Sequence, residues 1–322
     1  MKKFGWTVIG CGGIANTVAQ EIAEEGSGKV VACWNRTPAR AAAFASRFGC
    51  KAYPTAKEAI TAEGVEGVYI ATTHDMHGHY AKLCIECGVP VLCEKPFTVN
   101  RKEAEEVFAL AKEKGVYVAE AMWTWFNSPA QTVRRWVREG KVGAVQSVYA
   151  SLAFPLLETC DNPRLTAPEL IGGALMDIGV YPVRYILELF GMPKSVAAKG
   201  ELAGGVDIEE TITMDYGSFT AEILSSIRKG EPETLVIRGT EGEIVVPDFH
   251  MTRQGALTGK HGDSFTCTAL LYGTQCRIVS EEIRAGKTES DCASRQSVLD
   301  TMALLDECRR QLGVVYPCEE NL

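Results

Sequence analysis

The sequence predicts an α/β protein in which a doubly wound parallel sheet is followed by an α+β domain built on a largely antiparallel sheet. Two observations support this fold class. Short runs of β-forming residues alternate with helical segments over the first third of the chain, and closely spaced strand-like runs follow from residue 145 onward. Alternation of strands and helices is typical of parallel sheets, whereas strands joined by short turns are typical of antiparallel sheets.

The chain has 322 residues, more than one hydrophobic core usually supports, and we therefore expect two domains. We place their boundary after the last strand of the alternating pattern, which gives a first domain of residues 1–122 and a second of residues 123–322. Apolar residues make up 46% of the chain and charged residues 23%, so the composition is that of a globular protein rather than a disordered one.

In the first domain, strand-like and helix-like segments alternate in order along the chain. The expected strands are residues 4–9, 29–34, 67–71, 90–93 and 116–120. The expected helices are residues 16–25, 39–48, 80–87 and 101–114. Thr37 and Pro38 suit the start of the second helix, because threonine caps helix N-termini and proline fits the first turn.

The second domain shows recurring β-rich runs separated by short turns. The expected strands are residues 145–154, 195–201, 211–215, 218–227, 234–238 and 243–246. A helix over residues 175–190 is expected to cover one face of this sheet, and further helices follow residue 272. Residues 156–168 and 248–262 follow no regular pattern and are expected to be loops.

Composition also argues against several classes of partner. The formal net charge of −8 gives no positive field for nucleic acid, and we see no apolar run of about 18 residues that would cross a membrane. The twelve cysteines are scattered along a chain large enough to fold without disulfides, so we expect reduced thiols and a cytoplasmic protein. The CxxC pair Cys84 and Cys87 lies in an expected helix and is interpreted as small buried residues.

A glycine-rich turn follows the first strand and precedes the first helix, which is the arrangement of a Rossmann dinucleotide site. Gly10 permits the tight turn, Gly12 lets the backbone approach a pyrophosphate, and the small Ala15 lets helix and strand pack closely. Gly13 and Ile14 open the helix, whose N-terminal N–H groups attract phosphate. These five residues are therefore predicted to bind the cofactor.

The end of the second strand predicts which dinucleotide is bound. NAD enzymes usually place a carboxylate there for the ribose hydroxyl, but this chain has Asn35 and Arg36. A guanidinium pairs with the 2'-phosphate of NADP, which a carboxylate would repel. We predict NADP, with NAD possible; the alternative is that Arg36 is an ordinary exposed loop residue.

The fourth strand ends at Glu94, Lys95 and Pro96, which places a lysine at the carboxyl edge of the sheet, where doubly wound folds bind ligands. Together with residues 120–124 and 172–182, this EKP segment resembles the glucose-fructose oxidoreductase and inositol dehydrogenase (Gfo/Idh/MocA) family over nearly the whole chain. Within the family, the similarity is greatest to dimeric dihydrodiol dehydrogenase and NADP-dependent D-xylose dehydrogenase. The resemblance implies that Glu94 and Lys95 lie at the cofactor.

The resemblance implies an NADP-dependent oxidoreductase that transfers hydride between the nicotinamide and a hydroxyl-bearing carbon of a sugar or cyclic trans-diol. Two alternatives remain open: an NAD-dependent inositol or amino-sugar dehydrogenase, and a dinucleotide-binding regulator without catalysis. The presence of Lys95, Asp177 and Tyr181 argues against a regulator. The family also commonly pairs its large sheets face to face, and we therefore expect a homodimer through the C-terminal sheet.

Three residues are candidates for catalysis. Many relatives have histidine where this chain has Tyr181, four residues after Asp177, and a spacing of four places both side chains on one helix face. A tyrosine with an ordinary pKa near 10 needs a neighbouring cation to act as a base at neutral pH, and Lys95 is the candidate. Tyr181, or Lys95 through it, would move the hydroxyl proton, and Asp177 would orient the substrate or Lys95. The alternatives are that Lys95 forms a surface ion pair and that Tyr181 is a buried phenol without a catalytic role.

The resemblance suggests further contacts with substrate and cofactor. Trp123 and Phe154 are candidates for the substrate pocket, because aromatic faces suit the CH faces of sugars, but either residue could belong to the core. Thr72, Thr73 and His77 lie in the loop after the third expected strand, which borders the cofactor in this family. His77 and its neighbouring histidines have no further ligand nearby, so we expect no metal.

Overall fold

The computed structural model describes residues 2–160 and 162–319, and the chain divides into two compact units. The first unit contains the chain through Asn127 together with Ala269–Val298, and the second contains Ser128–Thr268 together with the chain from Leu299 onward. The expected boundary after residue 122 therefore lies shortly before the observed one. Residues 269–298 belong with the first unit, and this return of the chain was not predicted from the sequence.

The first unit contains a six-stranded sheet in which neighbouring strands pair in parallel. Its order is β3 (Lys51–Ala52), β2 (Gly28–Trp34), β1 (Phe4–Ile9), β4 (Gly67–Ile70), β5 (Val91–Glu94) and β6 (Val118–Ala121). The strand order reverses between β1 and β4, as it does in Rossmann folds, where ligands bind at this switch point. The predicted doubly wound parallel sheet is confirmed.

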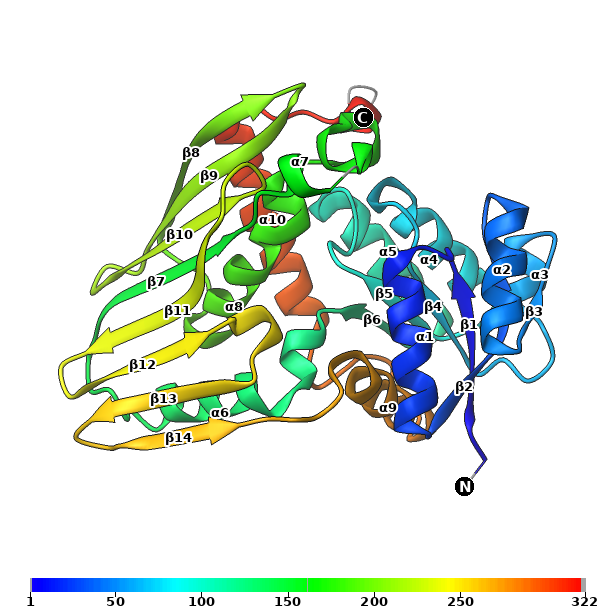
Figure 1. Ribbon diagram of the computed structural model, residues 1–322, viewed down its shortest axis with the longest axis horizontal. Coiled ribbons are helices and arrows are strands. Elements are labelled where there is room, and N and C mark those ends of the chain that lie inside the picture. The colour runs from blue at the N-terminus through cyan, green and yellow to red at the C-terminus, as the bar shows by residue number, and fades with distance from the viewer. Residues whose placement is uncertain (1, 161, 320–322) are drawn as a thin grey trace. The chain divides into compact units, whose positions relative to one another are not determined.

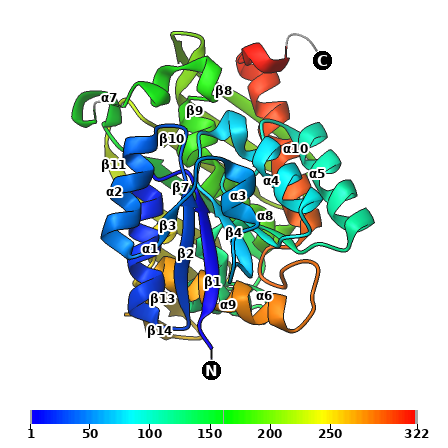
Figure 2. The same cartoon turned by 90° about the vertical axis from the view of Figure 1, so that its right-hand side faces the viewer.

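Helices flank the sheet of the first unit, with α1 and α2 on one side and α4 and α5 on the other (Figure 2). Their bounds are α1 (Gly13–Glu25), α2 (Pro38–Phe48), α3 (Ala56–Ile60), α4 (His77–Glu86) and α5 (Arg101–Lys114). Two of them begin three residues earlier than predicted, α1 at Gly13 and α4 at His77. Helix α5 has its predicted bounds, because the Asn100 side chain caps its first turn and Gly115 ends it in a left-handed conformation.

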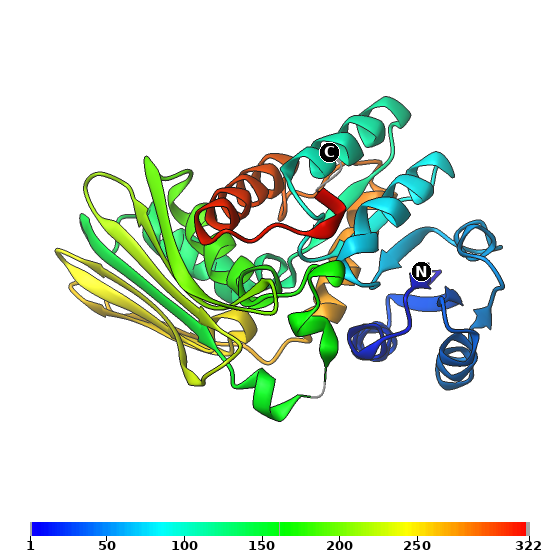
Figure 3. The same ribbon diagram turned by 90° about the horizontal axis from the view of Figure 1, so that it is seen from above.

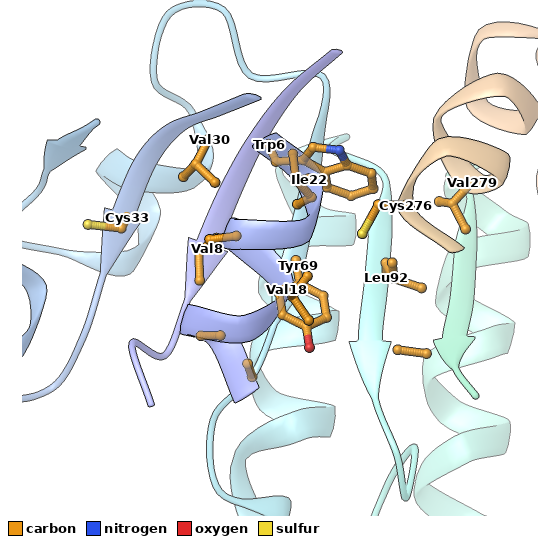
Figure 4. Close-up of a cluster of buried hydrophobic side chains, with 14 of the residues drawn as sticks. Trp6, Val8, Val18, Ile22, Val30, Cys33, Tyr69, Leu92, Cys276 and Val279 are labelled. Atoms are coloured by element: carbon orange, nitrogen blue, oxygen red, sulfur yellow. The ribbon is translucent and has the colours of Figure 1, made fainter. Parts of the chain in front are cut away.

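Helix α9 (Leu271–Arg284) joins the first unit through a side-chain cap and close packing. The backbone N–H groups of Tyr272 and Gly273 donate to Glu21 Oε2 of α1 at 2.7 and 2.9 Å. A Cβ atom at Gly273 would lie 2.8 Å from the Glu21 carbonyl oxygen, so a glycine is needed for this approach. Cys276 and Val279 then complete the core around Trp6, Tyr69 and Leu92 (Figure 4).

The second unit contains an eight-stranded sheet in which only β7 and β10 pair in parallel among its described neighbours. Its order is β14 (Asp263–Thr266), β13 (Gln254–Gly259), β12 (Gly242–Pro247), β11 (Glu231–Gly239), β7 (Val145–Ala153), β10 (Thr220–Ser226), β9 (Val206–Asp215) and β8 (Ser195–Ala203). The predicted largely antiparallel sheet is confirmed. The expectation of a loop over residues 248–262 was wrong, because β13 and the turn into β14 lie there; both strands are short and largely exposed, so they lack the apolar pattern of buried strands.

The longer helices of the second unit are α6 (Ser128–Arg138), α8 (Val180–Phe190) and most of α10 (Arg295–Leu312), whose first four residues belong to the first unit. Helix α8 contacts α6 and strands β7 and β10, and Figures 1 and 3 show the sheet with these helices on one side. A π-helix, η5 (Leu175–Gly179), precedes α8 directly where one α-helix was predicted. The short helices elsewhere in the chain are η1 (His74–Met76), η2 (Trp123–Phe126), α7 (Leu156–Thr159), η3 (Pro163–Thr166), η4 (Pro168–Leu170), η6 (Phe249–Met251) and η7 (Pro317–Glu319).

One helical stretch qualifies as a membrane span by length and composition alone. Pro168–Phe190 has a mean hydropathy of 1.3, contrary to the expectation that the chain has no such run. The protein buries 94% of this window, which is the behaviour of a core helix. Its apolar character is therefore explained by packing within the second unit.

Candidate active site

The glycine turn between β1 and α1 has the shape of a phosphate cradle. Gly10 has a φ of 94°, and a Cβ atom there would lie 2.4 Å from the Ala71 carbonyl oxygen, so only glycine fits. Cβ atoms at Gly12 and Gly13 would meet no protein atom within 4 Å. The first turn of α1 contains no acidic residue, which leaves the positive end of the helix dipole available to an anion. Ala15 is fully buried against the sheet, as predicted.

Asn35 and Arg36 follow β2, beside this turn, but they differ in exposure and contacts. Asn35 Oδ1 accepts a hydrogen bond from the Cys11 backbone N–H at 3.0 Å, and its Nδ2 donates to the Thr37 carbonyl oxygen at 3.2 Å. The Asn35 amide therefore shapes the glycine turn, and its contact with a cofactor stays a prediction. Arg36 is exposed and has its charge available.

A recess of about 430 Å³ adjoins the glycine turn within the first unit. Gly12 and Gly13 line one part of it, and Arg40 and Arg47 of α2 line another. Neither Arg40 nor Arg47 was predicted, because both lie on α2 and only the fold brings that helix to the glycine turn. The recess places positive charge beside the turn that suits a phosphate.

The loop after β4 contains residues with two different roles. Thr72 and Thr73 are partly exposed at the carboxyl edge of the sheet, as a cofactor contact requires. His77 is fully buried, and its Nδ1 lies 2.8 Å from the Pro96 carbonyl oxygen. Burial lowers the pKa of His77 to about 4, so its imidazole is neutral. His77 therefore supports the Lys95–Pro96 turn, and its contact with the cofactor stays a prediction.

Lys95 lies on a turn at the end of β5 that neighbouring side chains hold on several sides. The Lys95 backbone N–H donates to Glu94 Oε2 at 3.3 Å, and the Phe97 N–H donates to Glu120 Oε1 of β6 at 3.1 Å. The Tyr69 hydroxyl of β4 donates to the other oxygen of Glu94. Lys95 itself is partly exposed, whereas Glu94 is buried and supports the turn; the predicted contact of Glu94 with the cofactor stays a prediction.

The second unit pairs Asp177 with a residue that was not predicted. Asp177 Oδ1 lies 3.0 Å from Arg164 Nη2, and both side chains are largely buried. Asp177 belongs to the π-helix η5, whereas Tyr181 belongs to α8. The α-helical argument that a spacing of four aligns these two side chains therefore does not apply. π-helical turns are common at functional sites, because they change the direction in which a side chain points.

Tyr181 and Phe154 lie beside His250, which was also not predicted. The ring centroids of Tyr181 and His250 are 5.3 Å apart, and those of Phe154 and His250 are 6.1 Å apart. His250 Nδ1 is 2.7 Å from Glu233 Oε1. No regular pattern marks residues 248–262, so only the structure shows that His250 meets these two predicted residues.

The remaining predicted residues are placed as follows. Trp123 is 1% exposed and packs against Tyr272 with a centroid distance of 5.1 Å, so the core alternative describes it and it offers no open face to a substrate. Lys95 belongs to the first unit, and Asp177 and Tyr181 belong to the second. Over residues 2–160 and 162–319, no group of three or more histidine, cysteine, aspartate or glutamate side chains could hold a metal ion.

Two family models match the chain. The oxidoreductase family with an NAD-binding Rossmann fold matches residues 4–122, and the GFO/IDH/MocA C-terminal domain matches residues 130–245. The chain belongs to the Gfo/Idh/MocA oxidoreductase family. Its first unit is accordingly an NAD(P)-binding Rossmann domain, and the protein is a dehydrogenase-type enzyme acting on hydroxyl groups.

Relatives in the family are similar over nearly their full length. The chain is 30% identical to scyllo-inositol 2-dehydrogenase (NADP(+)) of Bacillus subtilis, covering 98% of this chain and 99% of the relative. It is 31% identical to trans-1,2-dihydrobenzene-1,2-diol dehydrogenase of Mus musculus, again covering 98% and 99%. These alignments confirm the predicted family over both units.

Solved structures share the fold. A 3-ketoreductase from Actinomadura kijaniata in complex with NADP and TDP-benzene has a TM-score of 0.83 at 22% identity, covering 97% of this chain and 98% of that one. An oxidoreductase from Desulfitobacterium hafniense described as NADPH-dependent has a TM-score of 0.86 at 18% identity, covering 97% and 96%. At such identities the likeness establishes the fold.

The burial of Glu94 predicts a pH-dependent stability. Burial raises the pKa of Glu94 from 4.5 to about 7, so the folded protein holds this proton more tightly than the unfolded chain does. The contribution of Glu94 to stability is therefore full below pH 4.5 and is lost as the pH rises through 7. Between pH 5 and 8, the free energy of unfolding of the wild type should fall by about 3 kcal/mol more than that of Glu94→Gln.

Urea unfolding at several pH values, followed by tryptophan fluorescence, measures this difference. Glu24→Gln is the matched control, because Glu24 lies exposed on α1 with Gln20 as its partner. Its pH dependence should equal that of the wild type. A wild type and a Glu94→Gln variant with parallel pH profiles would show that Glu94 is ionised in the folded protein throughout this range.

Proposed function

We propose that the protein transfers hydride between NADP and a hydroxyl-bearing carbon of a sugar or a cyclic trans-diol. The observation that carries this proposal is the Lys95 turn, which neighbouring side chains hold at the carboxyl edge of the Rossmann sheet while Lys95 itself stays partly exposed. These contacts fix the backbone position from which the Lys95 side chain starts. A purely structural domain has no need of such a turn at its ligand-binding edge.

The relatives support the substrate class. One acts on scyllo-inositol and another on trans-1,2-dihydrobenzene-1,2-diol, as their names state. Both compounds are six-membered rings with hydroxyl groups on adjacent carbons. We therefore favour a cyclic polyol or diol, with pyranose sugars as close chemical equivalents. Because inositols belong to the same class of cyclic polyols, the proposal includes an inositol dehydrogenase.

The choice of NADP over NAD rests on charge at the end of β2. Arg36 is exposed there, no carboxylate takes the position after β2, and Arg40 and Arg47 line the adjoining recess. Positive charge at this point favours a cofactor with a 2'-phosphate. The relative from Bacillus subtilis is itself described as NADP(+)-dependent.

We assign the proton chemistry to residues of this chain as follows. The nicotinamide, when bound, supplies or accepts the hydride. Tyr181 exchanges a proton with the oxygen of the reacting group: its hydroxyl donates during reduction and recovers the proton during oxidation. Lys95 supplies positive charge at the carboxyl edge of the Rossmann sheet. Asp177, fixed by its ion pair with Arg164, orients the substrate.

Substitutions at Lys95 and Tyr181 test these roles. Lys95→Met and Tyr181→Phe should each lower kcat by at least about 100-fold, because general acid–base groups contribute on that scale. NADP binding, measured by fluorescence titration, should persist in both variants. Tyr185→Phe is the matched control, since it removes a hydroxyl one turn further along α8, and it should keep most of the activity. Full turnover in Tyr181→Phe would move the proton transfer to another group.

The cofactor preference has its own test. Arg36→Ala should weaken NADP binding about 10- to 100-fold and leave NAD binding nearly unchanged, because a charge-assisted hydrogen bond is lost only with the phosphate. Isothermal titration with both dinucleotides measures the ratio. Arg101→Ala removes an exposed arginine that pairs with Glu105 on α5, and it should alter neither affinity. An unchanged ratio in Arg36→Ala would identify Arg36 as an ordinary loop residue.

We further propose a homodimer through the open face of the second unit's sheet. Val245, Val236 and Tyr149 are paired in register across β12, β11 and β7, and all three are only half-buried. The residues beside them in the chain, such as Ile237 and Ile244, are fully buried on the opposite face. An apolar row on an uncovered sheet face favours self-association.

Multi-angle light scattering at micromolar concentration should give the mass of two chains. Val236→Glu should shift this mass toward one chain, because it places a charge in the centre of the apolar row. Ala42→Glu, on the exposed side of α2, is the control and should remain dimeric. A wild type with the mass of a single chain would contradict the proposal.

The twelve cysteines, which the structure describes as free thiols, support our proposal of a reducing, cytoplasmic environment.

A further inference from the structure

The short helix η6 holds His250 at a fixed backbone position. The Asp248 N–H that precedes η6 donates to the Glu233 carbonyl oxygen at 3.2 Å. Phe249 is fully buried and packs edge-on against Tyr185, with ring centroids 5.6 Å apart and an interplanar angle of 90°. η6 is therefore anchored both to β11 and to α8.

Glu233 fixes the imidazole ring as well as the backbone of His250. Its Oε1 accepts from the His250 backbone N–H and from His250 Nδ1, both at 2.7 Å. The Glu233 side chain is 5% exposed and that of His250 16% exposed. A carboxylate only accepts hydrogen bonds, so Nδ1 carries a proton, and in the tautomer with its proton on Nδ1 the acceptor nitrogen is Nε2.

The position of His250 relative to α8 follows from two matched aromatic contacts. Tyr181 and Tyr185 are one helical turn apart in α8. Tyr185 packs on Phe249, and Tyr181 packs beside the next residue, His250, with ring centroids 5.3 Å apart. The ring centroid of Phe154 lies 6.1 Å from that of the same imidazole, with an interplanar angle of 65°. A polar ring held by Glu233 thus lies beside both the proposed proton-exchanging tyrosine and an aromatic side chain.

We infer that His250 is a specificity-determining residue that accepts a hydrogen bond from the hydroxyl on the carbon next to the reacting carbon. The site would then select substrates with two adjacent hydroxyl groups over matching alcohols with one. Tyr181 exchanges the proton of the reacting hydroxyl, and the neighbouring hydroxyl, bound by His250, is unchanged by the reaction. This inference rests on the proposed function.

The physical basis is the cost of an unpaired buried polar group. A site that hydrogen-bonds a substrate hydroxyl discriminates strongly against the analogue that lacks it, because the protein group then loses its partner away from water. An apolar pocket discriminates much less, since an added hydroxyl changes its packing only slightly. His250 is such a hydrogen-bonding group, because its bond to the Glu233 carboxylate prevents the ring from rotating Nε2 away from the substrate.

The experiment compares two matched substrate pairs with NADP as the oxidant. One pair is trans-cyclohexane-1,2-diol and cyclohexanol, and the other, for oxidation at C1, is D-glucose and 2-deoxy-D-glucose, which lacks the hydroxyl next to that carbon. For a pair that the wild type oxidises, kcat/KM should favour the member with a hydroxyl next to the reacting carbon by at least about 100-fold. His250→Phe, which keeps a ring but removes both nitrogens, should reduce that preference at least about 10-fold, mainly through KM.

Two further variants separate specificity from folding. His250→Gln restores an acceptor oxygen and should recover part of the preference. His261→Phe makes the same change at an exposed histidine beside Glu241, and it should leave the preference unchanged. NADP affinity and the urea unfolding midpoint, measured for each variant, show that the comparison is made between folded proteins.

The possible results distinguish failure of the proposed function from failure of the role of His250. Failure of the wild type to oxidise any of the four compounds would overturn the proposed function. Oxidation of both members of a pair with equal kcat/KM would leave that function standing and overturn the role of His250. The role would also be overturned by His250→Phe retaining the wild-type preference, or by equal losses on both members, which is the result expected from a structural role alone.

Discussion

The buried carboxylate of Glu94 is the interaction on which the cofactor edge of the first unit depends. It accepts hydrogen bonds from the Tyr69 hydroxyl of β4 and from the Lys95 backbone, so it ties the end of β5 to its neighbouring strand. Such a contact requires the parallel register in which β4 and β5 end together. The position of the Lys95 turn is therefore a consequence of sheet pairing.

The first unit shows how polar burial and function are combined. Glu94, Glu120 and His77 are all buried, and each has a hydrogen-bonding partner in the turn after β5. Burying such groups costs free energy unless they are paired, and the raised pKa of Glu94 and lowered pKa of His77 are the visible consequences. The same contacts make the turn rigid. A rigid turn holds the backbone of Lys95 in one place, whereas a flexible loop would not.

Local patterns predicted the parts of this fold that local physics determines. Asn100 and Gly115 bracket α5, and its limits were predicted correctly because capping depends on adjacent residues. The place of α9 could not be predicted, because Glu21 and Tyr272 are 251 residues apart and nothing in either segment points to the other. Glu233 and His250 are only 17 residues apart, but their contact depends on the pairing of β11 with β12 and on the short helix η6, and no sequence pattern marks that helix.

Several residues of the predicted site also make structural contacts that the sequence does not reveal. Glu94, His77 and Asn35 occupy positions that the family pattern associates with the cofactor, and the structure gives each a hydrogen bond that supports a turn. A motif identifies where a site lies, but the contacts of its residues depend on the fold around them. In the second unit, Tyr185 and Phe249 are buried partners that fix how Tyr181 and His250 face each other. The buried side chains of Tyr185 and Phe249 thus set the relative position of Tyr181 and His250, to which we assign substrate recognition. In this unit, the packing of the core therefore determines the geometry of the site.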